Sequence, residues 1–126
     1  MHHNRLVAAL VVLILDALWV HFVMNPRYHT MIEEIQRGTS MRVRAPAAVL
    51  AYGFMIIGLL VFCVRDDDAP VKAAMRGALF GFVLYGVYDC TNAAIFDRFE
   101  ISLAVLDVAW GAFVYGLATG IAASLK

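Results

Sequence analysis

The sequence has little charge, and it lacks the residue patterns of most soluble protein classes. Only 16% of its 126 residues are charged, against about 25% in an ordinary soluble domain. Hydrophobic residues make up 63%, against about 45–50% in such domains. A soluble domain of this length could not bury so much apolar surface. A soluble enzyme and a disordered tail are therefore excluded, and the composition predicts a single transmembrane domain over residues 1–126.

Cysteine and clustered histidine are also scarce. Cys63 and Cys90 are too few for a disulfide framework or a zinc site, so we expect both to be free and buried. No nucleophile–base pairing, glycine-rich phosphate loop or His-x-x-His cluster occurs. The sequence thus predicts no catalytic, cofactor-binding or metal-binding residue and no enzyme activity, although an intramembrane hydrolase using two aspartates stays open as an alternative.

Charge of either sign is balanced, which leaves the lipid bilayer as the expected partner. Ten acidic residues oppose ten basic ones, so net charge favours no nucleic acid. Lysine and arginine divide five against five between the two expected membrane sides, and the positive-inside rule therefore favours neither orientation.

Long hydrophobic runs are what the sequence does contain. Four stretches approach the roughly 20 apolar residues that cross a bilayer as a helix. All three prolines lie between these stretches or in a first turn, where a missing N–H is tolerated. A cleaved signal peptide is disfavoured because Asp16 interrupts the first run and no small-residue cleavage site follows. The prediction is an all-α, integral membrane four-helix bundle with helices at residues 6–24, 45–64, 77–96 and 101–125.

The segment between the first two stretches also has helical periodicity. Its apolar residues are spaced i, i+3, i+4 and i+7, and Gly38 can end a helix that they form. The spacing predicts a short amphipathic helix over residues 28–37 that lies in the headgroup region, parallel to the membrane plane. A polar loop with chance periodicity is the alternative. The residues that form the pattern are Tyr28, Met31, Ile32 and Ile35.

Three carboxylates fall inside the predicted spans: Asp16, Asp89 and Asp107. Each costs about 2.5–3.5 kcal/mol to place in a bilayer on insertion scales. With a rise of about 1.5 Å per residue and four alternating spans, all three are displaced from the midplane toward the side of the first loop. We therefore expect them to converge on one polar cluster in that half of the membrane.

Each carboxylate has polar or aromatic neighbours within one turn. Asp16 and Asp107 share the pattern Leu-Asp-x-x-Trp-x-x-Phe, which indicates either an internal duplication or a local solution used twice. A buried indole N–H needs an acceptor, and a carboxyl on a neighbouring helix can provide it. Besides the three acids, the predicted cluster contains Trp19, Tyr85, Tyr88, Thr91, Asn92 and Trp110.

Glycines four residues apart occur in the third and fourth stretches. Gly77 and Gly81 lie in one, and Gly116 and Gly120 lie in the other. Such pairs let two helix backbones approach closely. Because only residues 97–100 separate these stretches, we expect a tight antiparallel hairpin.

The motifs of the last two stretches resemble the signature of a family of small membrane proteins known as domain of unknown function 2177. The resembling residues are Tyr88-Asp89-x-Thr91-Asn92 and Leu106-Asp107-x-x-Trp110-Gly111, joined by Leu15-Asp16-x-x-Trp19 and Tyr28. The resemblance covers nearly the whole chain and implies a four-helix membrane protein. Because the family occurs in bacteria and large DNA viruses, it implies a bacterial inner membrane, or a viral or host membrane. It implies no activity.

The polar cluster supports two hypotheses about function. In the first, the acids hydrogen-bond to Trp, Tyr and Asn and hold the helices together, and the protein is a structural or assembly component in a homo-oligomer or larger assembly. In the second, the acids handle protons or cations in a small proton- or cation-coupled transporter or channel subunit. The sequence favours the first. Four helices enclose little room for a substrate path, so transport would require an oligomer.

Overall fold

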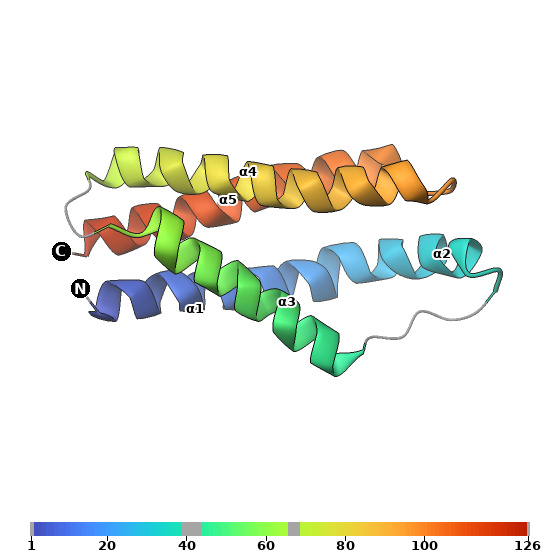
Figure 1. Cartoon of the computed structure of the whole chain (residues 1–126), viewed down its shortest axis with the longest axis horizontal. Helices are drawn as coiled ribbons and strands as arrows, with labels where there is room; N and C mark the ends of the chain where they lie inside the picture. Colours follow the sequence, from blue (N-terminus) through green and yellow to red (C-terminus); the bar gives the residue numbers. More distant parts are fainter. Residues whose placement is uncertain (1, 39–43, 66–68, 126) are drawn as a thin grey trace.

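The computed structural model describes residues 2–38, 44–65 and 69–125 (Figure 1). All regular elements in this part of the chain are helical, and four helical stretches are long and apolar enough to cross a membrane. The elements are α1 (His2–Trp19), the π-helical turn η1 (Val20–Met24), α2 (Asn25–Ile35), α3 (Ala45–Gly58), the π-helical turn η2 (Leu59–Cys63), α4 (Pro70–Ile95) and α5 (Ile101–Ser124). The predicted all-α membrane architecture is confirmed.

One helix begins earlier than expected. The sequence predicts a third span from residue 77, whereas α4 starts at Pro70. Proline suits a first helical turn, and the charges of Lys72 and Arg76 hide this start in a search for apolar runs. The Arg76 guanidinium donates a hydrogen bond of 2.9 Å to the backbone carbonyl of Cys63, at the end of η2. Arg76 thus satisfies a backbone carbonyl at the end of η2, and its charge does not interrupt the helix of α4.

The segment expected to lie in the membrane plane is helical, but it continues α1. Figure 1 shows α1, η1 and α2 as one long rod. A proline inside a helix normally clashes with the carbonyl four residues back. The wide turn of η1 contains that residue, Phe22, so the helix passes Pro26 without a break. Met31 of α2 is buried against the start of α5, and α2 ends where Arg37 and Gly38 take φ values of 56° and 90°.

α4 and α5 form the tightest helix pair, as the glycine spacing predicts. A Cβ atom on Gly81 would lie 2.0 Å from the carbonyl oxygen of Gly111, and one on Gly77 would lie 2.0 Å from the hydroxyl oxygen of Thr119. That hydroxyl donates to the Ala73 carbonyl of α4 at 2.9 Å. The lack of a side chain at Gly77 and Gly81 therefore lets the backbones of α4 and α5 come together along the hairpin.

The packing encloses the polar residues Asp16, Asp89, Asp107 and Thr119 among apolar ones such as Leu59, while many of the exposed side chains are large and apolar. α5 is the most buried of the four spans; α1 packs on one side of it, and α3 crosses the bundle diagonally (Figure 1). The outward-facing residues include many Leu, Val, Ile and Phe side chains. A bilayer favours such a surface, because lipid is as apolar as these side chains and drives no burial of them. The interior is consequently where the polar residues gather.

Candidate functional site

The carboxyl group of Asp16 lies where all four spans meet. Asp16 is 4% exposed and accepts three hydrogen bonds, each from a different helix. Tyr52 of α3 donates at 2.8 Å, Tyr85 of α4 at 2.7 Å, and the Trp110 indole of α5 at 3.0 Å. Three donors satisfy most of the acceptor capacity of an ionised carboxylate.

Tyr52 is the member of this network that sequence reasoning missed. The second span contains no acidic or basic residue, so a search for charged side chains within the spans does not find Tyr52. The available signal was that Tyr52 is the only hydroxyl-bearing side chain in residues 45–64. A lone tyrosine in an apolar helix needs an acceptor when its hydroxyl is buried.

The two Asp-x-x-Trp motifs bond to each other across the bundle. The Trp110 indole of α5 donates to Asp16 of α1, and the Trp19 indole of α1 donates to Asp107 of α5 at 3.4 Å. The indole rings stack with centroids 4.5 Å apart and planes 2° apart. Because α1 and α5 run antiparallel (Figure 1), each motif supplies the donor that the other motif's acid accepts.

The reciprocal Asp–Trp hydrogen bonds indicate how the sequence pattern shared by the first and fourth spans arose. Tandem duplication of a two-helix unit would relate the first span to the third, and those two run in the same direction. The observed relation joins the first span to the fourth, which runs in the opposite direction (Figure 1). The geometry therefore favours a local solution used twice over a duplication.

Asp89 and Asp107 form a second centre with different surroundings. Asp89 is fully buried, at 0% exposure, and Asp107 is 7% exposed. Their carboxyl groups lie within hydrogen-bonding reach of each other. Neither oxygen of Asp89 has a hydrogen-bond donor, and the buried hydroxyl of Tyr28, which interacts with Asp89, has no well-formed partner either. This centre thus contains two facing carboxyl groups, with the Tyr28 hydroxyl as a neighbouring donor whose hydrogen bond to Asp89 is not formed.

The other predicted members on α4 divide between its buried face and its outer surface. Tyr85 and Asp89, four residues apart, share the buried face of α4. Tyr88 is 58% exposed and interacts with the half-buried Asn92, while Thr91 is exposed. The structure therefore brings the three acids, the two tryptophans and Tyr85 into the interior, and it leaves Tyr88 and Thr91 on the outer surface.

Other chemistry-bearing residues lie apart from the cluster. Cys63 and Cys90 are both free, but only Cys63 is buried; the expectation for Cys90 is wrong, because it occupies the lipid-facing side of α4. His21 is exposed and its ring meets that of Phe22 edge to face. Within the described ranges, no three His, Cys, Asp or Glu side chains are grouped closely enough to hold a metal ion.

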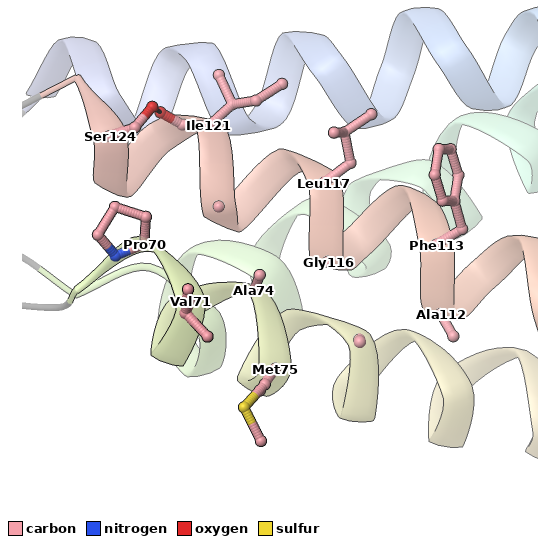
Figure 2. A pocket seen from close by; sticks show the side chains of 12 residues that line it. Pro70, Val71, Ala74, Met75, Ala112, Phe113, Gly116, Leu117, Ile121 and Ser124 are labelled. Carbon is pink, nitrogen blue, oxygen red and sulfur yellow. Dashed lines mark hydrogen bonds between the residues drawn. The ribbon is translucent and has the colours of Figure 1, made fainter.

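A shallow apolar groove of about 650 Å³ follows the outer seam between α4 and α5 (Figure 2). Its lining includes alanine and glycine residues on the facing sides of α4 and α5. Among these small residues are Ala74, Ala78, Gly116 and Gly120. Larger side chains such as Met75 and Phe113 also line the groove (Figure 2). Small residues on a helix surface let another helix approach closely in a membrane.

A second hollow lies at the loop end of the bundle, between the end of α2 and the turn that joins α4 to α5. Its volume is about 610 Å³, and it is the more polar of the two. Glu34 and Arg37 border it on one side, and Asp97 and Arg98 on the other. Charged residues at the ends of membrane spans lie in the region of lipid headgroups and water.

Comparison with known proteins identifies a family and no individual relative. The family described as "Predicted membrane protein (DUF2177)" matches residues 3–124. No curated protein and no solved structure matches the chain.

Proposed function

The chain belongs to the predicted membrane protein family DUF2177, and we propose that it is a structural or assembly component of a membrane. Its place as an integral membrane protein follows from the family and from the four apolar helices. A bacterial inner membrane, or a viral or host membrane, is the proposed location. The proposal includes no catalysis.

The observation that carries this proposal is the triple hydrogen bonding of Asp16. Tyr52, Tyr85 and Trp110 each donate from a different helix to the one carboxyl on α1. Interhelical hydrogen bonds in a bilayer contribute about 0.6–2 kcal/mol each. Three of them on one acceptor specify which helices are neighbours, in a setting where lipid provides no hydrophobic drive for association. An acid that accepts hydrogen bonds from three other helices supports a structural role.

The groove on the α4–α5 seam supports the assembly half of the proposal. It lies on the surface that faces lipid, and the small residues in its lining suit a helix of another subunit. The proposed partners are therefore a homo-oligomer or a larger membrane assembly, together with the bilayer itself.

Reconstitution into liposomes tests the proposal. A structural component is expected to dissipate an imposed pH gradient no faster than empty liposomes, at several protein-to-lipid ratios. Gradient-driven flux that depends on protein and is abolished by Asp89→Asn would contradict a purely structural role. Asp16→Asn serves as the matched variant, since it alters the hydrogen-bonded acid and leaves the Asp89–Asp107 pair intact.

One observation favours a second candidate, a small proton- or cation-coupled transporter or channel subunit. Asp89 is buried without a donor, which a structural hydrogen-bond network does not require. Intramembrane acids with unsatisfied oxygens are typical of ion and proton pathways. The same liposome experiment separates the candidates, with cation-selective flux as the positive result for the second.

A further inference from the structure

The Asp89–Asp107 pair differs from Asp16 in how its oxygens are satisfied. Asp16 accepts three hydrogen bonds and Asp107 accepts one from Trp19, whereas Asp89 accepts none. Asp89 is nevertheless fully enclosed by the protein. An unsatisfied buried polar group costs the full penalty of its desolvation. The two carboxyl groups therefore face each other without a hydrogen between them, and the nearby Tyr28 hydroxyl forms no hydrogen bond with either.

No cation compensates the two acids. The groups that act on either carboxyl, taken over every helix packed around them, are acids, hydroxyls and one indole; no Lys, Arg or His of the described chain is among them. Two negative charges this close repel strongly in an interior of low dielectric constant. Tyr28 of α2, Trp19 of α1 and the acid Asp16 act on the pair. The hydroxyls of Tyr85, Tyr88 and Tyr52 act on it at longer range, from α4 and α3.

We infer that Asp89 and Asp107 form a binding site for one exchangeable proton, held between their two carboxyl groups. The proton forms an O–H bond with one carboxyl, and an oxygen of the other accepts the hydrogen bond. The charge of the pair then falls from two negative charges to one. Trp19 already donates to Asp107 and favours its ionised form, so Asp89 is the carboxyl that carries the proton.

The donor set fits a proton better than a metal ion. Calcium takes six to eight oxygen ligands and magnesium requires an octahedron of them, in general terms. This centre offers two carboxyl groups and the hydroxyl of Tyr28, while the backbone carbonyls of α4 and α5 are occupied within their helices. The part of the chain that the structure describes holds no group of three metal-ligating side chains. One proton satisfies the pair without further ligands.

Tyr28 places the site in contact with the loop end of the bundle. Its hydroxyl faces Asp89, and its ring lies 6.3 Å from that of Phe99, at the turn before α5. The polar hollow bordered by Glu34 and Asp97 lies at this same end. Proton exchange is thus expected from the loop side, by way of Tyr28. This inference goes beyond the structural role of Asp16 and does not depend on it.

Infrared titration of the purified full chain in lipid nanodiscs tests the inference. A free aspartic acid is fully ionised near neutral pH. The site is expected to show a carbonyl band of a protonated carboxyl group at that pH, and the band should shift in D₂O, because the proton exchanges. Both measurements use the wild-type chain, so they hold even if a variant fails to fold. Absence of the band from wild type would overturn the inference.

Matched variants assign the band to the pair. Asp89→Asn and Asp107→Asn should each abolish it, because the new amide donates a hydrogen bond to the remaining carboxyl and stabilises its ionised form. Asp16→Asn should leave it unchanged. Loss of the band in Asp16→Asn alone would overturn the assignment. Loss of the band from wild type when Na⁺ is added at constant pH would also overturn it, because Na⁺ would then displace the proton and the pair would be a cation site. Failure here leaves the structural proposal intact, because that proposal concerns Asp16.

Discussion

At the scale of single residues, hydrogen-bond donors decide what each buried acid does. Asp16 and Asp107 stand in the same sequence pattern, yet one accepts three bonds and the other accepts one. The difference comes from partners outside the pattern, Tyr52 and Tyr85, which reach only Asp16. Identical motifs therefore differ in role because their neighbours differ.

The two tryptophans provide a test of this account. Trp110→Phe should lower the free energy of unfolding by about 1–2 kcal/mol, because it removes the 3.0 Å bond to Asp16 and weakens the ring stack. Trp19→Phe removes a ring of the same size with a longer bond of 3.4 Å, so its effect should be smaller. Unfolding in mixed micelles, followed by circular dichroism, measures both. If Trp19→Phe lowered the free energy of unfolding as much as Trp110→Phe, or more, the ring stack would contribute more to stability than the hydrogen bond to Asp16.

At the scale of elements, absent side chains determine how closely α4 and α5 approach. Gly81 faces the Gly111 carbonyl so closely that even a methyl group has no room. Gly86, on the same helix, has nothing within 4 Å of the position its Cβ would take. The two glycines thus share a helix and differ only in the face they occupy.

This difference predicts opposite effects of one substitution. Gly81→Ala should destabilise the protein by about 1–3 kcal/mol through overpacking. Gly86→Ala should be neutral or stabilising by up to about 1 kcal/mol, since alanine is the better helix former. Thermal unfolding in detergent compares them. Tolerance of alanine at both positions would mean that the hairpin is looser than the structure shows.

The continuation of α1 into α2 predicts a contrast between neighbouring positions. A spin label in place of Met31 should be immobile and shielded from water, because Met31 packs against Phe99 and Leu103 at the start of α5. A label in place of Glu34 should be mobile and accessible to a water-soluble relaxation agent, because Glu34 is exposed. Electron paramagnetic resonance in nanodiscs measures both properties. Equal accessibility would contradict the packing of α2 on the hairpin.

At the scale of the whole molecule, α3 is joined to the bundle by few polar contacts. Tyr52 donates to Asp16 from α3, and Tyr115 of α5 donates to the Met55 carbonyl of α3 at 3.3 Å. α1 and α5, in contrast, share the indole stack and both Asp–Trp bonds. The helix least tied to the others should therefore be the first to separate.

The double variant Tyr52→Phe with Tyr115→Phe tests that order. Pulsed dipolar spectroscopy between labels on α3 and α5 should show a broader distance distribution in the variant, while the distribution between α1 and α5 stays narrow. Tyr88→Phe is the control, since Tyr88 is an exposed tyrosine on the lipid side. Broadening of both distributions would mean that the bundle opens as one unit.

Much of the architecture could be predicted from the sequence because it depends on composition and local spacing. Four apolar runs of sufficient length require four spanning helices, since a bilayer leaves backbone groups no other way to be satisfied. The glycines at 77 and 81 likewise predict the close α4–α5 pair, which depends only on a helical repeat and a short turn. The unexpected start of α4 and the continuous α1–α2 rod both arise at prolines, whose effect depends on the turn that surrounds them.

The partners of the acids were decided by the tertiary structure alone. Periodicity places Asp16 and Trp19 on one face of a helix, but it does not say which opposite helix receives that face. The crossing of α3 brings Tyr52 to Asp16, and the antiparallel fit of α1 on α5 exchanges the two tryptophans. Asp89 packs where it accepts no formed hydrogen bond. Local sequence determines which residues must be inside a membrane protein, whereas three-dimensional packing determines which donor, if any, each buried acid finds.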